Sequence, residues 1–224
     1  MSLQHGSIES FFLEGAAGRL EALLNLGVPS ADYACVVCHP HPLFGGTMHN
    51  KVVFHAMKAL NGFGFPVLRF NFRGVGASAG EHDHGRGEVD DVRVALDYLG
   101  RRFSAPILFA GFSFGAAIGV QAAVPHPRVK ALISLGTPVN ADGREYSYAL
   151  LGKSAQAKLL LSGGRDEFAT PAQLAQVFDG AAEPKRLVVI PEADHFFTGH
   201  LEEMRAALSG WVREVLGATA VPAV

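Results

Sequence analysis

The sequence lacks a strong excess of charge of either sign. Its 224 residues include 19 lysines and arginines against 21 aspartates and glutamates, and the net charge of −2 gives no electrostatic reason to expect nucleic acid or an anionic membrane as a partner. Charged residues make up 18% of the chain and hydrophobic residues 49%, which is typical of a compact globular chain. We expect one domain over residues 1–224, with a core at about 8–216 and a frayed tail at 217–224.

An uninterrupted hydrophobic run of membrane-spanning length is also missing. Residues 103–127 contain no Asp, Glu, Lys or Arg and are long enough to span a bilayer, but prolines and glycines interrupt them. A strand, a turn and a helix explain this stretch better. Residues 1–6 lack the basic start and the apolar core of a signal peptide. We therefore expect a cytoplasmic protein that does not bind membranes.

Cysteine is scarce, and the two residues present, Cys35 and Cys38, are spaced as Cys-x-x-Cys. A redox pair of this spacing needs a helix N-terminus to lower a thiol pKa, and a zinc site needs a second pair that the sequence does not contain. Residues 33–38 instead have the composition of a strand, in which positions i and i+3 face opposite sides. We expect two buried free thiols, which fit a reducing cytoplasm.

Apolar, β-rich segments alternate with helical patterns along most of the chain. Three early strands follow one another without helices, and after residue 50 strands and helices alternate. This order predicts an α/β fold with antiparallel N-terminal strands, a mostly parallel central sheet and helices on both faces. The predicted strands are residues 8–13, 19–26, 33–39, 66–72, 106–110, 129–135, 157–161 and 186–190, and the predicted helices include residues 50–61, 88–101 and the amphipathic segment from 201 to 215.

The pentapeptide Gly-Phe-Ser-Phe-Gly at residues 111–115 lies between an apolar strand-like run and a segment typical of a buried helix. A strand that turns at once into a helix crowds its backbone, and Gly111 and Gly115 remove the Cβ atoms that would clash there. Such a turn places the Ser113 hydroxyl at the carboxyl end of the sheet, near the positive end of a helix. The pattern predicts that Ser113 is a nucleophile.

A serine hydroxyl is a poor nucleophile unless a base removes its proton during the attack. Of the ten histidines, His195 has the most suitable position. It follows the predicted strand 186–190 after a short loop and precedes the last helix, and functional groups of open α/β sheets gather at the carboxyl ends of strands. We therefore expect His195 to be the catalytic base.

The base in turn needs an acid that holds its tautomer and stabilises the imidazolium ion. Asp166 lies just past the predicted strand 157–161, and Asp142, after the preceding strand, is the alternative. Asp194 is adjacent to the histidine and is expected to point elsewhere, and Glu167 is expected to face solvent. With Asp166, the chain order Ser, Asp, His is that of the α/β-hydrolase arrangement.

Two backbone N–H groups are expected to bind the oxyanion of the transition state. One belongs to Phe114, the residue after the nucleophile. The other should come from residues 39–46, where the two prolines cannot donate. The remaining candidates are His41, Leu43 and Phe44, of which we favour the first two.

A glycine-rich segment at residues 74–80 resembles a phosphate-binding turn. A dinucleotide site, however, needs a helix that begins directly at the glycines, whereas this segment continues into the polar residues 81–87. We expect a loop beside the active site, held by hydrogen bonds from Arg73 to carbonyl groups.

Two His-x-His pairs, His39 with His41 and His82 with His84, raise the alternative of a metal site. The acidic residue that a metallo-hydrolase needs next to such a pair is missing after His41. We therefore expect neither a metal nor a cofactor. His39 is expected to anchor its loop by a hydrogen bond to the backbone, and His82 and His84 are expected to be exposed.

With these residues assembled, the chain resembles the α/β-hydrolase superfamily, and most of all the small, lidless bacterial serine hydrolases and carboxylesterases related to the dienelactone hydrolase group. The resemblance covers residues 8–216 and rests on the motifs at 39–48, 71–78 and 111–115, together with Asp166 and His195. It implies hydrolysis of a small-molecule ester or thioester through an acyl-enzyme, without a metal or organic cofactor. Dienelactone hydrolases themselves use a cysteine where this chain has Ser113, which argues against their particular substrate.

Only about twenty residues separate the predicted strands 129–135 and 157–161, which leaves little room for a cap domain. We expect an open, shallow site that accepts carboxylic esters of small or flexible acyl groups. The alternatives are a thioesterase or peptidase that uses the same triad, and a binding module without catalytic activity on a hydrolase fold.

Overall fold

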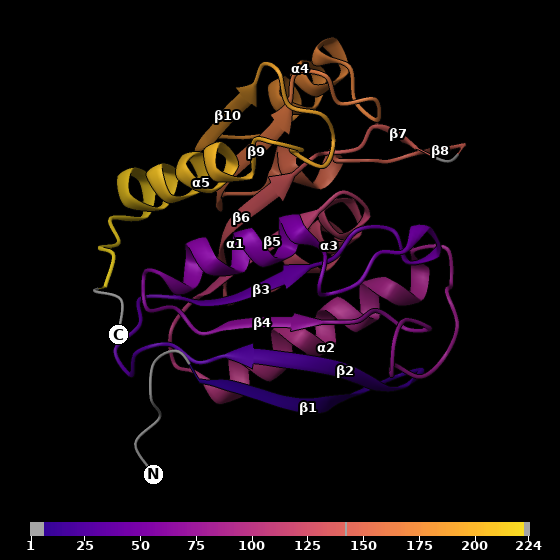
Figure 1. The fold of residues 1–224 in the computed structure, drawn as a ribbon, viewed down its shortest axis with the longest axis vertical. Coiled ribbons are helices and arrows are strands. Elements are labelled where there is room, and N and C mark those ends of the chain that lie inside the picture. The colour runs from indigo at the N-terminus through magenta and orange to yellow at the C-terminus, as the bar shows by residue number, and fades with distance from the viewer. Residues whose placement is uncertain (1–6, 142, 222–224) are drawn as a thin grey trace.

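The computed structural model describes residues 7–141 and 143–221, and these form one eight-stranded sheet with helices on both faces (Figure 1). The strand order is β1-β2-β4-β3-β5-β6-β9-β10. The first two strands form an antiparallel hairpin, β2 also runs antiparallel to β4, and the remaining neighbours are parallel. The strands are β1 Ile8–Gly15, β2 Gly18–Asn25, β3 Ala34–Cys38, β4 Val67–Phe70, β5 Ile107–Phe112, β6 Val129–Leu135, β9 Ala157–Gly163 and β10 Lys185–Ile190.

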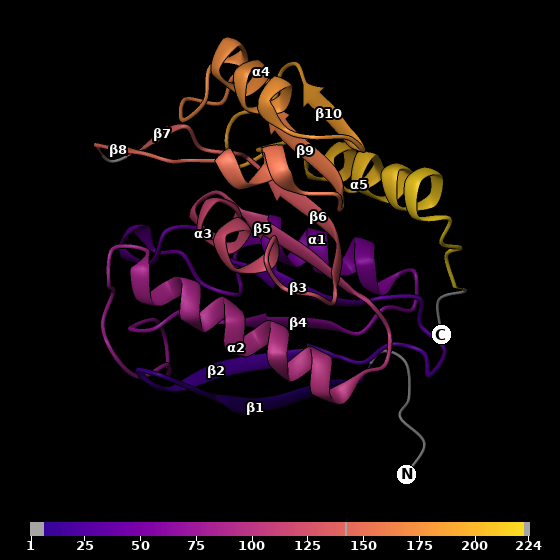
Figure 2. The same cartoon turned by 180° about the vertical axis from the view of Figure 1, so that it is seen from behind.

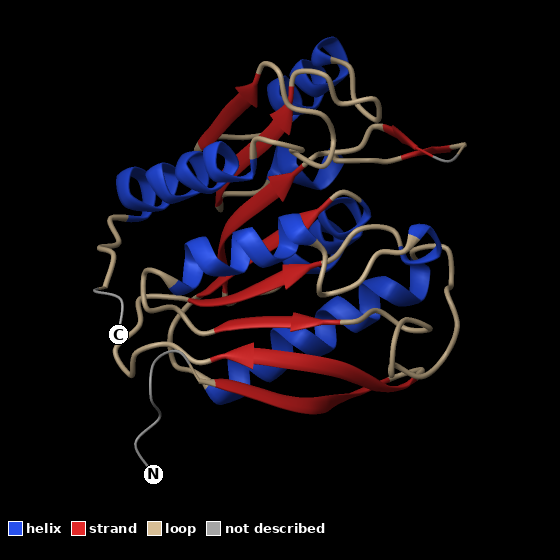
Figure 3. Cartoon of the chain, viewed as in Figure 1, coloured by secondary structure: helices blue, strands red, loops and turns tan. Residues whose placement is uncertain are grey.

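The helices form two layers because the strands alternate apolar side chains between the two faces of the sheet. One buried cluster packs between the sheet and helices α2 and α3, and the other packs against α1 and α5. The two layers are seen from opposite sides in Figures 1 and 2, and the helices are blue in Figure 3. The helices are α1 Lys51–Asn61, α2 Arg86–Arg102, α3 Phe114–Ala123, α4 Pro171–Gly180 and α5 Leu201–Leu216.

The fold confirms the predicted α/β class and the antiparallel start of the sheet. Residues 103–127 contain strand β5, a tight turn and helix α3, and no helix within the described residues is long and apolar enough to cross a bilayer. Within the expected tail, Ala218 is buried and the Val221 N–H donates to Gly62 O at 3.0 Å. Residues 222–224 lie outside the described part.

Cys35 and Cys38 lie on opposite faces of the central strand β3, as the i and i+3 spacing predicts. Both thiols are free and fully buried. Burial raises the pKa of each thiol well above its ordinary value, which keeps both protonated and unreactive. These cysteines are core residues.

The connection between β6 and β9 is short. Its described residues form a small hairpin, β7 Asn140–Ala141 with β8 Arg144–Glu145, and a 3-10 helix, η2 Ala149–Lys153. A second 3-10 helix, η1 Pro42–Phe44, follows β3. In Figure 1 the arrowheads of β3 and β4 point toward the side on which the β7–β8 hairpin lies. The described part of this connection contains no cap domain over the carboxyl ends of the strands.

Candidate active site

Ser113 occupies the turn between β5 and α3 in a backbone conformation that residues other than glycine rarely adopt. Its φ is 54° and its ψ is −124°. The flanking glycines are required by packing: a Cβ atom on Gly111 would lie 2.6 Å from Ala116 Cα, and one on Gly115 would lie 2.4 Å from His39 O. The glycine spacing that marks the motif in the sequence therefore corresponds to two backbone contacts that exclude any side chain.

The structure brings Ser113, His195 and Asp166 together in a chain of hydrogen bonds. Ser113 Oγ lies 2.9 Å from His195 Nε2, and His195 Nδ1 lies 2.8 Å from Asp166 Oδ2. The residues His195 and Asp166 are only 1% and 5% exposed. Since the carboxylate can only accept, the imidazole donates from Nδ1 and can accept the serine proton at Nε2. This geometry is suited to a serine that attacks as its proton moves to the histidine.

The loops that contain Asp166 and His195 approach each other closely because Gly163 and Gly164 carry no side chains. A Cβ atom on Gly163 would lie 2.2 Å from Ala193 O, and one on Gly164 would lie 2.4 Å from Pro191 O. Gly136, with φ of 52°, leaves room for the imidazole, since its Cβ would lie 3.1 Å from His195 Cε1. Neighbouring strands β6, β9 and β10 therefore present these loops at one edge of the sheet.

The other acidic residues near the histidine take different roles. The Asp194 carboxylate accepts the Thr198 N–H at 2.8 Å. Burial raises the pKa of the Asp194 carboxyl group, but the hydrogen bonds from Thr198 and Phe196 and the charge of His195 together lower it by more, so the net shift is downward. Glu167 is exposed, as predicted. The alternative acid, Asp142, lies outside the described residues.

The candidate oxyanion donors lie on two sides of Ser113. Phe114 is the first residue of α3, so its N–H has no helical partner four residues earlier. In the loop after β3, the Leu43 N–H donates to His41 Nδ1 at 3.2 Å, and the Phe44 N–H donates to His41 O at 3.2 Å. The amide groups of Leu43 and Phe44 are thus engaged within η1.

His39 anchors the start of this loop, as predicted. Its Nε2 accepts the Phe72 N–H at 3.0 Å, so Nδ1 carries the proton and donates to Pro40 O at 2.7 Å. Burial lowers the pKa of His39 to about 4, which keeps the ring neutral. With both nitrogens engaged, this imidazole has no lone pair left for a metal.

Two expectations about the loop after β4 are wrong. His82 is not exposed: its side chain is 8% exposed and its Nδ1 lies 2.8 Å from the buried Glu88 Oε1. Arg73 does not hold the loop through carbonyl groups but forms an ion pair with Asp91, with 2.6 Å between Nη2 and Oδ1. Both acidic partners come from α2, and no pattern within the loop itself reveals them. His84 is exposed, as predicted.

A pocket of about 250 Å³ opens at Ser113 and His195. Its walls are mainly apolar, and among the described residues that line it there is no Asp, Glu, Lys or Arg. Tyr146 enters from the connection after β6, a contribution that sequence reasoning missed because the connection has no regular pattern. The aromatic side chains are Phe44, Phe114, Tyr146, Phe168 and Phe196.

A family model described as serine aminopeptidase, S33, matches residues 29–157, more than half of the chain. The chain belongs to this family of α/β hydrolases. A serine hydrolase without a lid from Xanthomonas campestris is 34% identical, with a TM-score of 0.82 over 98% of this chain and 99% of that chain. An α/β serine hydrolase homologue from Coxiella burnetii is 38% identical, with a TM-score of 0.82 over 90% and 96% of the two chains.

A curated relative, an uncharacterized protein of Rickettsia prowazekii, is 34% identical over 209 residues, which cover 90% of this chain and 87% of that protein. Together with the solved structures, it shows that the similarity extends over nearly the whole chain. These findings confirm the predicted membership of the α/β-hydrolase superfamily and the resemblance to its lidless members.

Proposed function

We propose that this α/β hydrolase cleaves carboxylic esters of small or flexible, uncharged acyl groups through an acyl-enzyme on Ser113. The observation that carries the proposal is the hydrogen-bond chain from Asp166 through His195 to Ser113 at the base of an apolar pocket. A buried carboxylate that fixes the histidine tautomer, and a serine within reach of the other ring nitrogen, are the parts that acyl transfer requires.

The reaction proceeds in two halves. Ser113 Oγ attacks the acyl carbon while its proton passes to His195 Nε2, and the carbonyl oxygen becomes an oxyanion held by backbone N–H groups. His195 then gives the proton to the departing alkoxide, which leaves the acyl group on Ser113. Water repeats the same sequence, with His195 first as base and then as acid, and the carboxylic acid is released.

We assign the oxyanion donors to Phe114 and His41. Phe114 stands at the positive end of α3. His41 lines the pocket and packs on Phe114, with ring centroids 4.7 Å apart. Removing one such donor costs an ordinary serine hydrolase about 10²- to 10³-fold in kcat.

The pocket supports a small or medium acyl group. Its volume of about 250 Å³ corresponds to roughly eight water molecules in the liquid, and so to an acyl group of a similar number of heavy atoms. A peptide substrate with a free amino group would need a carboxylate to bind it, and the described lining residues contain none. This favours esters over the aminopeptidase activity in the name of the family.

A fluorophosphonate label followed by a substrate panel tests the proposal. We expect the label to react with the wild type and not with Ser113→Ala, as read by intact mass. Among 4-nitrophenyl esters of two to twelve acyl carbons, we expect kcat/KM to be highest at or below about eight carbons, and thioesters and aminoacyl amides of matched size serve as comparisons. A wild type that does not react with the label would favour a binding module, and a preference for long-chain triglycerides would contradict the substrate class.

A further inference from the structure

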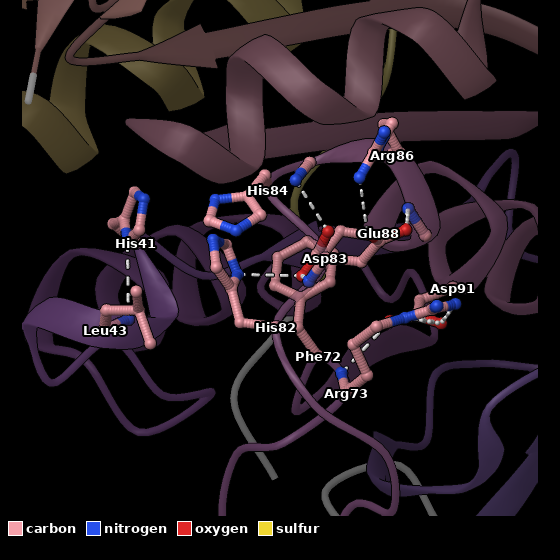
Figure 4. Close-up of polar contacts among 12 residues, drawn as sticks. His41, Leu43, Phe72, Arg73, His82, Asp83, His84, Arg86, Glu88 and Asp91 are labelled. Carbon is pink, nitrogen blue, oxygen red and sulfur yellow. Dashed lines mark hydrogen bonds and ion pairs between the residues drawn. The ribbon is translucent and has the colours of Figure 1, made fainter. Parts of the chain in front are cut away.

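A second imidazole lies next to His41. The centroids of the His41 and His82 rings are 5.0 Å apart, and His82 also lies 5.8 Å from the Phe114 ring. Since His41 itself packs on Phe114, the three rings form one mutual contact. Figure 4 shows His41 and His82 with the polar partners of the loop after β4. The two residues to which we assign the oxyanion donors are thus both in contact with His82.

His82 is held from the other side by Glu88, a carboxylate without exposure to solvent. Glu88 Oε1 lies 2.8 Å from His82 Nδ1 and accepts the Asp83 N–H at 2.8 Å, while Oε2 accepts the Gly85 N–H at 2.8 Å. Glu88 lies in the first turn of α2, where the helix dipole stabilises a negative charge. Helix α2 therefore fixes the course of the loop and places a carboxylate against the imidazole.

The loop that contains His41 is anchored at its start by His39, but its helical turn lies at the surface. Helix η1 is three residues long and has no buried residues, and Leu43 and Phe44 are 63% and 67% exposed. Phe114, in contrast, is fixed by the buried helix α3. Oxyanion donors are effective because they are held in place before charge develops, so the position of His41 has to come from its neighbours.

We propose that Glu88 and His82 are positioning residues for the oxyanion hole. Through its ring contact, His82 holds His41 beside Phe114, and Glu88 fixes His82 by its carboxylate. Neither residue exchanges a proton with the substrate. This inference rests on the proposed ester hydrolysis, since it concerns the donors that stabilise the oxyanion of that reaction.

The experiment compares an oxygen ester with its thionoester, in which sulfur replaces the carbonyl oxygen. Sulfur is a weaker hydrogen-bond acceptor than oxygen, so the thionoester gains less from the backbone donors. A loss of protein stability or of active fraction lowers both rates by the same factor. A displaced donor lowers the rate of the oxygen ester more. The ratio of the two kcat/KM values therefore reports on the oxyanion hole alone.

We expect His82→Ala to lower kcat for 4-nitrophenyl butyrate by about 10- to 100-fold with little change in KM, because misplacement of about 1 Å can cost about 100-fold. The ratio of ester to thionoester should fall at least severalfold. His82→Phe keeps a ring against His41 but loses the contact with Glu88, and should lie between the wild type and His82→Ala. Rates are normalised to the sites titrated by fluorophosphonate at saturation.

His49→Ala is the matched control, because His49 is another exposed histidine and does not line the pocket. It should keep the wild-type rate and ratio. If His82→Ala does not fold, His82→Gln serves the same comparison. An unchanged ratio in a folded His82 variant, or an equal loss for both substrates, would overturn this inference and leave the proposed function standing. A wild type inactive toward both substrates would overturn the proposed function first.

Discussion

The two sides of Ser113 are built by different means. On the acid–base side, His195 and Asp166 are buried and joined by hydrogen bonds, and glycines at the strand ends let their loops meet. On the side of the proposed oxyanion donors, His41 lies next to an exposed three-residue turn and contacts the rings of Phe114 and His82. One side is positioned by backbone contacts within the sheet edge, the other by packing between side chains.

This difference predicts how each side responds to change. A substitution on the acid–base side that removes one hydrogen bond interrupts the hydrogen-bond chain from Asp166 through His195 to Ser113. Its effect on activity should be large. On the oxyanion side several side-chain contacts surround His41. A substitution that removes one of them should therefore cause only a partial loss of activity. Substitutions on both sides of Ser113 test that contrast.

Asp166→Asn should have the largest effect. The amide keeps the shape of the side chain but stabilises the wrong tautomer of His195, and by analogy with the same change in serine proteases we expect a loss of about 10³- to 10⁴-fold in kcat. Steady-state kinetics with an activated ester measures it. A loss below tenfold in the folded variant would show that another group orients His195.

The loss of folding stability in acid should depend on His39, which anchors the loop after β3. Its pKa is about 4 in the folded chain against 6.5 for an ordinary histidine, so the unfolded chain binds the proton more tightly. The contribution of His39 to the free energy of unfolding is therefore complete above pH 6.5 and is lost as the pH falls toward 4. At about 1.4 kcal/mol per pH unit, the loss amounts to up to about 3 kcal/mol.

Urea unfolding at pH 7 and pH 4.5 measures this dependence. His39→Gln can still accept the Phe72 N–H but does not titrate, so its stability should fall less between the two pH values than that of the wild type. Equal losses in both proteins would mean that other groups account for the acid sensitivity.

Phe44→Ala should change the preference for acyl groups without stopping the reaction. Phe44 lines the pocket but is two-thirds exposed. Its removal should therefore cost only part of the binding free energy that a fully buried aromatic ring would supply. We expect kcat/KM for a hexanoyl ester to fall about three- to tenfold, while that for an acetyl ester stays unchanged. Leu43→Ala, in the same turn but outside the pocket lining, is the control and should alter neither.

Glu167→Gln should have the smallest effect, below about twofold in kcat/KM, because an exposed charge next to Asp166 is screened by solvent. It is the matched control for Asp166→Asn on the acid–base side. A loss comparable to that of Asp166→Asn would show that Asp166 alone does not act as the acid.

The acid–base side could be predicted from the sequence because its residues follow recognisable strands. The Ser113 turn has glycines at fixed offsets, and Asp166 and His195 each come shortly after an apolar run. Parallel strands bring their carboxyl ends to one edge, so position along the chain was enough to place the three residues near one another.

The oxyanion side could be predicted only in part. Residues 39–46 were expected to supply a donor, but the choice between His41 and Leu43 depends on the hydrogen bond from the Leu43 N–H to a neighbouring imidazole. His82 was expected to be exposed because polar residues surround it. Its burial comes from Glu88 and from a ring more than forty positions earlier in the chain. Contacts of this kind leave no periodic pattern in the sequence.

The central claim is that Ser113 is acylated during turnover, and trapping of the acyl-enzyme tests it most directly. A slow ester is mixed with the protein, quenched in acid within the first turnover and digested for peptide mass measurement. We predict that the peptide containing Ser113 gains the mass of the acyl group in the wild type, whereas Ser113→Ala gains none and loses about 10⁴- to 10⁶-fold in kcat. Turnover by Ser113→Ala at the wild-type rate, or an acyl group found on another residue, would contradict the account.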